Sequence, residues 1–225
     1  MDSNMKNDPI LGREVARYLK SLGLDTPSFE NGLSKEQKIS RIADSFKDIM
    51  LTLGLDLNDD SLIDSPQRVA KMFVNETFWG LEADSFPKCS VIDNKMGYDE
   101  MLTVKDIKVM SNCEHHFVII DGFADVAYIP KDKVLGLSKI NRVVNYYCRR
   151  PQVQERLTKQ IFHSLSYILG TEDVAVVIDA THYCVKARGV QDTNSHTVSS
   201  KLGGVFKTDP ATRAEFLSFC KKDRN

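Results

Sequence analysis

The pattern of hydrophobic and polar positions predicts helices in the first third of the chain. Mixed helical periodicity runs from Pro9 to about Leu24, and residues 25–29 interrupt it. Ser34 has the side chain of a good N-cap, and apolar residues recur at helical spacing from Lys35 to Leu53. A further helix is predicted from Ser65 to Gly80, because Pro66 occupies a first helical position. We therefore expect a helical hairpin and one extra helix.

From residue 102 onward the pattern changes to one of strands mixed with helices. Residues 102–110 and 117–129 carry the alternating β-branched and aromatic side chains of strands. The remaining predicted elements are a helix capped by Ser138, a helix from Pro151 to Gly170, strands at 174–181 and 198–206, and a helix at 210–220. This order, helices and then β-β-α-α-β-β, predicts an α+β fold with a helical region at residues 1–95 and a sheet domain at 96–225.

Composition is that of an ordinary globular protein and limits the kinds of partner. The 225 residues are 42% hydrophobic and 27% charged, and the formal net charge is −1. We therefore expect no nucleic acid partner, and any anion must meet a local basic cluster. The polar N-terminus has no signal-peptide core, and no apolar run has the length of a membrane span. Five cysteines in such a chain predict reduced thiols and a cytoplasmic location without membrane association.

Cysteine and histidine residues indicate a metal site. Cys113 and His116 lie three residues apart, directly before an apolar run, and a thiolate with an imidazole suits zinc. Cys184 is the best candidate for a third ligand. His182 and Cys184 are two residues apart, so on an extended chain they would project from the same side. Spacing alone leaves two interpretations open, a metal site or buried thiols beside a solvated imidazole.

A metal at these residues would have an open position, because the sequence suggests no fourth protein ligand. Three protein ligands and a water describe a catalytic zinc, whose bound water has a pKa of about 7. His115 and His182 would then remain free to transfer protons near neutral pH. The alternative for each of these two histidines is a simple surface residue.

Basic residues beside a helix start suggest an anion site. Ser138, Lys139 and Arg142 would lie in the first turn of a predicted helix, where free amides and the helix dipole favour anions. Arg188 follows Cys184 by four residues. These groups would suit a triphosphate, although lysine and arginine in a first turn are also common as a solvated face. The chain has no G-x-x-x-x-G-K-[ST] sequence, so this is not a P-loop.

Gln154 and Glu155 open the next predicted helix. A carboxylate in a first turn is commonly only a partner of the helix dipole. It could also accept two hydrogen bonds from the edge of a guanine ring, and spacing cannot distinguish these roles.

Taken together, these motifs resemble the zinc-dependent GTP cyclohydrolase I family over roughly Leu55 to Phe219. The residues that carry the resemblance are Asp60–Met72, Cys113–His116, Val126–Pro130, Gly136–Lys139, Arg150–Thr158 and His182–Gly189. Many members read Leu-Leu-Pro after the paired histidines, whereas this chain has Phe117-Val118-Ile119, a form that resembles a bacterial branch.

The resemblance implies a role for each candidate residue. Cys113, His116 and Cys184 would bind Zn²⁺, and Glu155 with Gln154 would hold the guanine edge. The ribose-triphosphate end would meet the remaining polar set, Ser138, Lys139, Arg142 and Arg188. His115, His182 and Ser138 would move protons.

The resemblance also implies the fold, assembly and reaction. Family members carry a tunnelling fold (T-fold), with an antiparallel sheet and two helices on one face, and assemble as pentamers stacked into decamers with active sites at subunit interfaces. GTP would be hydrolysed at C8 of guanine, releasing formate and giving 7,8-dihydroneopterin triphosphate in the first step of tetrahydrofolate biosynthesis.

Other zinc proteins fit the sequence less well. A deaminase would need H-x-E with P-C-x-x-C, and a metalloprotease would need H-E-x-x-H; the chain has neither. A non-catalytic T-fold protein that binds a purine or pterin and carries structural zinc would need a fourth ligand, or would lack the proton-transfer histidines. We therefore expect an enzyme.

Overall fold

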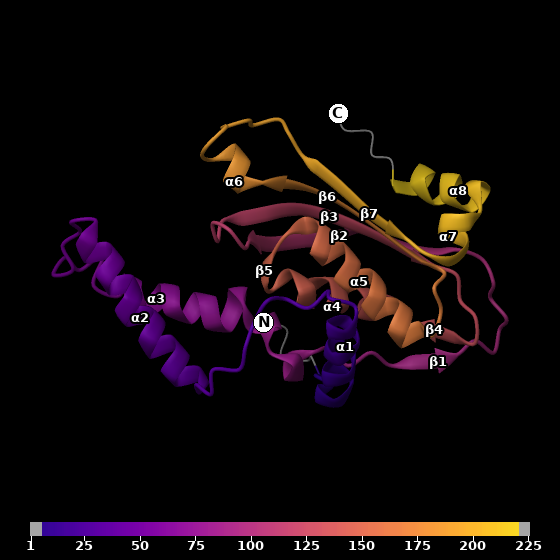
Figure 1. The fold of residues 1–225 in the computed structure, drawn as a ribbon, viewed down its shortest axis with the longest axis horizontal. Helices are drawn as coiled ribbons and strands as arrows, with labels where there is room; N and C mark the ends of the chain where they lie inside the picture. Colours follow the sequence, from indigo (N-terminus) through magenta and orange to yellow (C-terminus); the bar gives the residue numbers. More distant parts are fainter. Residues whose placement is uncertain (1–5, 221–225) are drawn as a thin grey trace.

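The computed structural model describes residues 6–220 and contains a five-stranded sheet (Figure 1). Four strands form an antiparallel array: β2 (Leu102–Cys113), β3 (Ile119–Tyr128), β6 (Val174–His182) and β7 (Thr197–Leu202). A two-residue strand, β5 (Pro151–Gln152), pairs in parallel with the end of β2, so the order is β5-β2-β3-β6-β7. The four predicted strands are present, which confirms the α+β fold.

Helices cover both faces of the sheet. Helices α4 (Leu137–Cys148) and α5 (Gln154–Leu169) pack on one face as the predicted pair (Figure 1). The short α7 (Gly204–Thr208) and α8 (Pro210–Cys220) lie on the other face, where a smaller core comprises Ala127, Ala175, Val177, Phe206 and Phe216. The alternation of side chains along β6 separates the two cores, because Val176 and Ile178 face α5 while Ala175 and Val177 face α8.

The register fixes what lies at each end of the sheet. Ile120 pairs with His182 at one end of the β3–β6 ladder, and Tyr128 pairs with Val174 at the other. Helix α4 follows β4 (Lys133–Leu135) at the Tyr128 end and runs to β5, beside Cys113 (Figure 1). Helix α5 returns in the opposite direction and ends at Gly170 as predicted, and the φ of 68° there makes this glycine a left-handed cap. The ends of α4 therefore lie at opposite ends of the sheet.

The N-terminal helices occupy two places. Helix α1 (Pro9–Ser21) packs against α5, and the α2 (Lys35–Thr52) and α3 (Ser65–Met72) hairpin extends away from the sheet (Figure 1). Ser34 caps α2 as predicted, since it accepts from the Gln37 amide while the Gln37 side chain accepts from Ser34. Strand β1 (Val91–Asp93) pairs with β4, which ties the preceding segment to the sheet domain.

The predicted helix from Ser65 to Gly80 is wrong beyond Met72. The chain continues as a π-helical turn, η1 (Phe73–Thr77), and then as two 3₁₀ turns, η2 (Trp79–Leu81) and η3 (Ala83–Ser85). At Gly80, within η2, the backbone passes close to α4, since an added Cβ there would lie 2.2 Å from the Tyr146 carbonyl oxygen. Glycine permits this close approach.

Three further boundaries differ from the prediction. Ser138 is the second residue of α4, and Gly136 occupies the N-cap instead. Pro151 begins β5 rather than a helix, because the end of β2 offers it a pairing partner. The last strand ends at Leu202, since the Gly203 backbone approaches the Phe162 ring and turns into α7. Of the helices in the described region, none combines the length and apolarity needed to cross a membrane.

Candidate metal and substrate site

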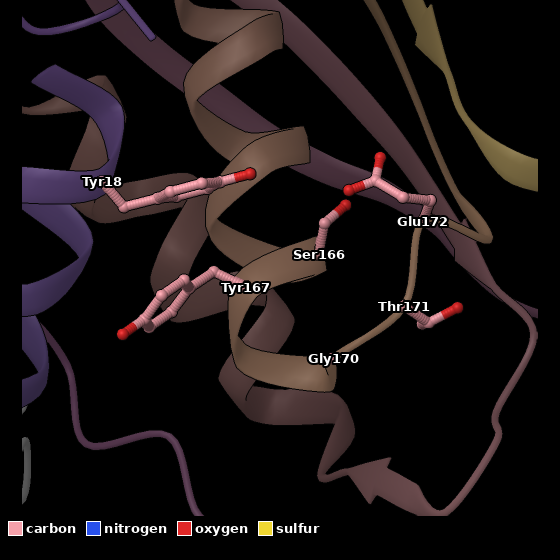
Figure 2. Close-up of a pocket in the computed structure, with 6 residues that line it drawn as sticks. All are labelled: Tyr18, Ser166, Tyr167, Gly170, Thr171 and Glu172. Atoms are coloured by element: carbon pink, nitrogen blue, oxygen red, sulfur yellow. The ribbon is translucent and has the colours of Figure 1, made fainter. Parts of the chain in front are cut away.

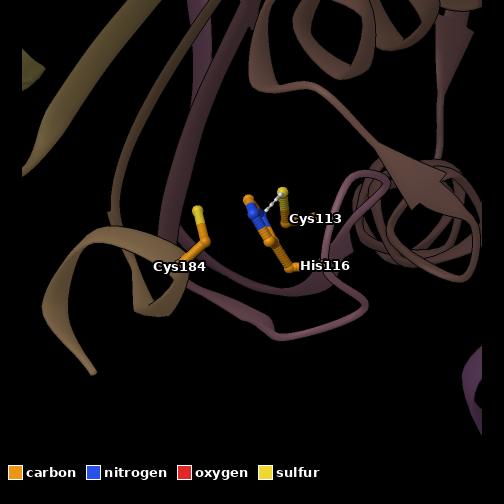
Figure 3. Close-up of side chains that lie close together, drawn as sticks. All are labelled: Cys113, His116 and Cys184. Carbon is orange, nitrogen blue, oxygen red and sulfur yellow. Dashed lines mark hydrogen bonds between the residues drawn. The ribbon is translucent and has the colours of Figure 1, made fainter. Parts of the chain in front are cut away.

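The structure brings Cys113, His116 and Cys184 together from two distant segments. Cys113 ends β2, His116 lies in the following turn, and Cys184 lies in α6 (Tyr183–Lys186) (Figure 3). One ligand atom of each residue lies within 4.8 Å of the others, and Cys113 Sγ is 3.8 Å from His116 Nδ1. Among residues 6–220, no fourth Cys, His, Asp or Glu joins this group. We call these three residues the metal cluster.

The donor set and spacing of the metal cluster fit a zinc ion. Tetrahedral zinc with bonds of about 2.0–2.3 Å separates its ligand atoms by roughly 3.4–3.8 Å. The Cys113–His116 distance already matches, and since all the ligand atoms lie within 4.8 Å of one another, the widest separation needs to close by at most about 1 Å. Burial raises the pKa of the Cys184 thiol, as does the neighbouring Cys113 thiol. A bound cation would therefore supply the charge that holds both sulfurs as thiolates.

The turn that carries the cluster is tightly held. The Cys113 amide donates to Val118 O at 2.8 Å, and the Phe117 amide donates to Cys113 O at 2.8 Å. Phe117 has a φ of 54°, an uncommon conformation for a bulky residue. Its ring packs against Phe73 and Phe78, with ring centroids 6.2 and 5.3 Å away. These aromatic contacts help to hold the strained turn in place.

The predicted geometry of His182 and Cys184 is wrong, although both residues lie at the site. Strand β6 ends at His182, and the chain turns into α6 at Tyr183. The chain is therefore not extended over these residues, and the expected projection from one side of a strand does not apply. His182 faces Gln154, and Cys184 faces His116.

Gln154 fixes the orientation of His182. Gln154 is 1% exposed, and its side-chain nitrogen lies within hydrogen-bond distance of Ile178 O, Thr197 O and Ser199 Oγ. Its Oε1 must therefore face His182 Nε2, at 2.7 Å. Neutral His182 then carries its proton on Nε2 and keeps a lone pair on Nδ1. Burial lowers the pKa of His182, and Glu155 partly opposes this.

This network bears on the predicted guanine contacts. Glu155 lies exposed in the first turn of α5, where its carboxylate can meet a ligand. The Gln154 amide is already satisfied within the protein, and a direct bond from its side chain to guanine would break the network. In this structure the Gln154 side chain therefore contacts His182, and its predicted contact with guanine stays a prediction.

Arg188 contacts the metal cluster directly. Its Nη1 lies 2.9 Å from His116 Nε2. A guanidinium has only donors, so Nε2 accepts and the neutral ring carries its proton on Nδ1. Metal ligation through Nδ1 would move that proton to Nε2 and turn Arg188 away. His115 lies beside the cluster with an exposed ring, its Nδ1 3.7 Å from Cys113 Sγ.

Ser138, Lys139 and Arg142 do not join these residues within one chain. They lie in the first turns of α4, at the Tyr128 end of the sheet, whereas Cys113 lies at the His182 end. Ser138 lies ten residues before Cys148, the end of α4, a separation of about 15 Å at 1.5 Å per residue. The predicted three-cation cluster is therefore divided, with Arg188 at one end and the lysine and other arginine at the opposite end.

Two polar residues that the sequence analysis did not single out, Glu114 and His196, have charged partners in the structure. Glu114 pairs with Arg156 of α5, and His196 Nδ1 lies 2.7 Å from Asp179 Oδ1 on β6. Nothing in the spacing predicts either pair, because their partners are distant in sequence.

A concavity of about 310 Å³ lies away from the metal cluster, at the C-terminal end of α5 (Figure 2). It is lined by Tyr18, Ser166, Tyr167, Gly170, Thr171 and Glu172. None of the candidate site residues lines it, and α5 separates it from the metal cluster at the helix N-terminus.

Comparison with known proteins gives a consistent result. Residues 42–221 match the family model of GTP cyclohydrolase I. A protein of Aeromonas salmonicida (strain A449) named GTP cyclohydrolase 1 is 60% identical over 207 residues, covering 92% of this chain and 95% of the relative. Proteins of the same name from Tolumonas auensis and Aliivibrio fischeri (strain ES114) are 58% and 54% identical, covering 91% and 96% of this chain and 94% and 98% of their own lengths.

Proposed function

Because this chain belongs to the GTP cyclohydrolase I family, we propose that it hydrolyses GTP at C8 of guanine, releasing formate and giving 7,8-dihydroneopterin triphosphate. The observation that carries the proposal is the metal cluster of Cys113, His116 and Cys184 beside the oriented imidazole of His182. This arrangement combines a three-ligand metal site with a group able to move protons, as a hydrolytic ring opening requires.

We assign the metal cluster to Zn²⁺ on its chemistry of two thiols and an imidazole. When bound, zinc would supply a Lewis acid that activates water at neutral pH. His182, held by Gln154, would exchange protons with the purine through Nδ1, and His115 would serve a later proton transfer. Glu155 would bind the ring N–H and amino group of guanine. These roles orient the base beside the metal cluster.

The phosphates are not cleaved in this reaction, so the basic residues that meet them would only bind and orient the substrate. Arg188 would be available to them once metal ligation turns it away from His116. Lys139 and Arg142 would bind the triphosphate, with Ser138 near the ribose. Since these α4 residues lie at the far end of their own sheet, they would serve the metal cluster of a neighbouring subunit.

We accordingly propose a homo-oligomer, with pentameric rings stacked as decamers. Among the described strands, β7 pairs only with β6, and β5 covers only the last two residues of β2. Both sheet edges are thus available to pair in a ring. Large apolar side chains are also exposed around the α2–α3 hairpin, namely Ile49, Leu51, Leu53, Leu55, Ile63 and Met72. They suit contact between stacked rings.

A cytoplasmic location belongs to the same proposal, because both cysteine ligands must stay reduced to bind the ion. A non-catalytic T-fold protein that binds a purine or pterin is the alternative. It would need the three-ligand cluster to be closed by a fourth side chain, and the described residues offer none.

Two products distinguish the proposed activity from other uses of GTP. The purified protein is incubated with Zn²⁺ and GTP, and formate is measured together with the fluorescent pterin formed on oxidation. Equal amounts of both products are expected. Glu155→Gln should weaken the use of GTP while the metal content stays the same, since a neutral amide cannot match both guanine donors. Release of inorganic phosphate without formate or pterin would exclude this function.

A further inference from the structure

We propose that Arg156 is a positioning residue, which holds the metal-binding turn against α5 through Glu114. The inference rests on the proposed function, because it concerns the same metal cluster. It also assigns a task to Glu114, which lies between the ligands Cys113 and His116 and for which the motif itself suggests no role.

The Glu114–Arg156 pair is well built and largely sheltered. Both terminal nitrogens of the Arg156 guanidinium contact Glu114 Oε2, with Nη1 at 2.9 Å and Nη2 closer. The Arg156 side chain is only 12% exposed, and that of Glu114 is 26% exposed. A charge-assisted contact in a sheltered position is stronger and less screened than a surface ion pair.

The position of Glu114 lets the ion pair restrain the segment that supplies two of the metal ligands. Glu114 directly follows Cys113 and precedes His116 by two residues, so it lies inside the segment that supplies two of the three ligands. Its amide donates to Gln152 O of β5 at 3.0 Å, while its carboxylate reaches α5. Backbone and side chain therefore tether the same residue in two directions, and the turn cannot rotate without breaking one tether.

The location of Arg156, the partner of Glu114, also matters for the site. Arg156 lies in the first turn of α5, next to Glu155 and two residues after Gln154. The pair thus joins the metal-binding turn to the helix end that orients His182 and presents the proposed guanine-binding carboxylate. Glu114 Oε1 also lies 3.9 Å from His115 Nε2. Holding this one carboxylate therefore helps to fix the separation between the metal-binding turn and the start of α5.

The role predicts a specific pattern among variants. Arg156→Met keeps the length of the side chain but removes both contacts, and the partly exposed Glu114 carboxylate can then turn to water. The metal-binding turn should loosen, and the affinity for Zn²⁺ should fall by about tenfold, the lower end of the effect for groups that support metal ligands. Arg156→Lys keeps the charge without the planar fork and should recover only part of the loss.

The experiment measures Zn²⁺ affinity of the full-length protein by competition with a chromophoric chelator, at a temperature where every variant is folded. Lys159→Met is the matched control, because Lys159 is an exposed cation one turn further along α5. We expect Arg156→Met to weaken zinc binding about tenfold and Lys159→Met to leave it within twofold. Glu114→Gln should also weaken it, and the double variant Glu114→Gln/Arg156→Met should be no weaker than the worse single variant.

The melting temperature of the metal-free variants separates positioning from general stability. If Arg156→Met lowers that temperature but binds Zn²⁺ as tightly as the unaltered protein, the pair is only structural and the proposal is overturned. The same holds if the losses of Glu114→Gln and Arg156→Met simply add. Failure of the unaltered protein to make formate would instead reject the proposed function, and the zinc titration would still decide the role of Arg156.

Discussion

Replacement of Gln154 by methionine tests whether catalysis depends on the orientation of His182. Methionine has a similar length and fits a buried position, but it has no amide. Gln154→Met should leave the His182 Nε2–H without its acceptor at 2.7 Å. The ring could then rotate or change tautomer, and its Nδ1 lone pair would no longer point reliably toward the substrate.

Two effects are expected, a loss of stability and a loss of kcat. The variant loses the bond to His182 and the two bonds that the amide can donate at one time to Ile178 O, Thr197 O or Ser199 Oγ. At about 1 kcal/mol for each net hydrogen bond, stability should fall by about 3 kcal/mol, or about 6–12 °C in melting temperature. General acid–base catalysis contributes at least about 10²-fold, so kcat should fall by about that factor.

Formate release measures kcat, and ¹⁵N NMR of the imidazole reports the tautomer. The unaltered protein should show neutral His182 protonated on Nε2, and Gln154→Met should show a mixture while retaining its zinc. Thr158→Val is the control, because Thr158 Oγ1 bonds to Ser199 Oγ and to the Gln154 carbonyl without touching His182. It should lose stability but little kcat. A twofold or smaller change of kcat in Gln154→Met, or a proton on Nδ1 in the unaltered protein, would refute the reasoning.

Three further predictions concern the ligand set, an acid-sensitive carboxylate and the sheet. Cys184→Ser should lose both bound zinc, measured by elemental analysis, and turnover; full activity would remove Cys184 from the site. Although burial acts to raise the pKa of Asp173, the Val205 amide and Lys131 outweigh it and lower the pKa below the ordinary 3.8. Its contribution to stability should thus be present above about pH 4 and be lost as the pH falls further, and Asp173→Asn should flatten this loss in acid-unfolding curves. Gly122→Ala would place a Cβ 2.2 Å from a carbonyl oxygen of β6 and should cost about 2–3 kcal/mol in denaturant unfolding; an unchanged midpoint would show that the β3–β6 ladder adjusts freely.

Elements whose signal is local were predictable from the sequence. The last helix runs from Pro210 to Cys220 as expected, and α2 begins after the Ser34 cap. Each depends on neighbouring residues, namely a cap, a helix-starting proline or a repeating apolar stripe. Strand β5 is different. It contains two residues, one of them a proline, and exists because the end of β2 offers it a partner. No local pattern could reveal that pairing.

The candidate site shows the same division between local and long-range information. The spacing of Cys113 and His116 indicated a metal site, and Cys184 was the best candidate for its third ligand. The structure brings the three residues together. The tether from Glu114 to Arg156 crosses 42 positions of sequence, and no spacing rule connects those residues. The contact of Gln154 with His182 depends on the register that ends β6 beside the start of α5. Such contacts follow from packing, and packing became visible only in the structure.

The antiparallel course of α4 and α5 places the two groups of proposed substrate-binding residues at opposite ends of one subunit. Helix α5 begins at the metal end of the sheet, so its first turn places Gln154 and Glu155 beside the metal cluster. Helix α4 begins at the other end, so its first turn carries Lys139 away from that cluster. Under the proposed function, a single chain would hold the base and the metal together but would leave the α4 cations away from the rest of the substrate. In the proposed ring, a neighbouring copy would supply the α4 start that each metal cluster lacks, and this would make the ring part of the chemistry.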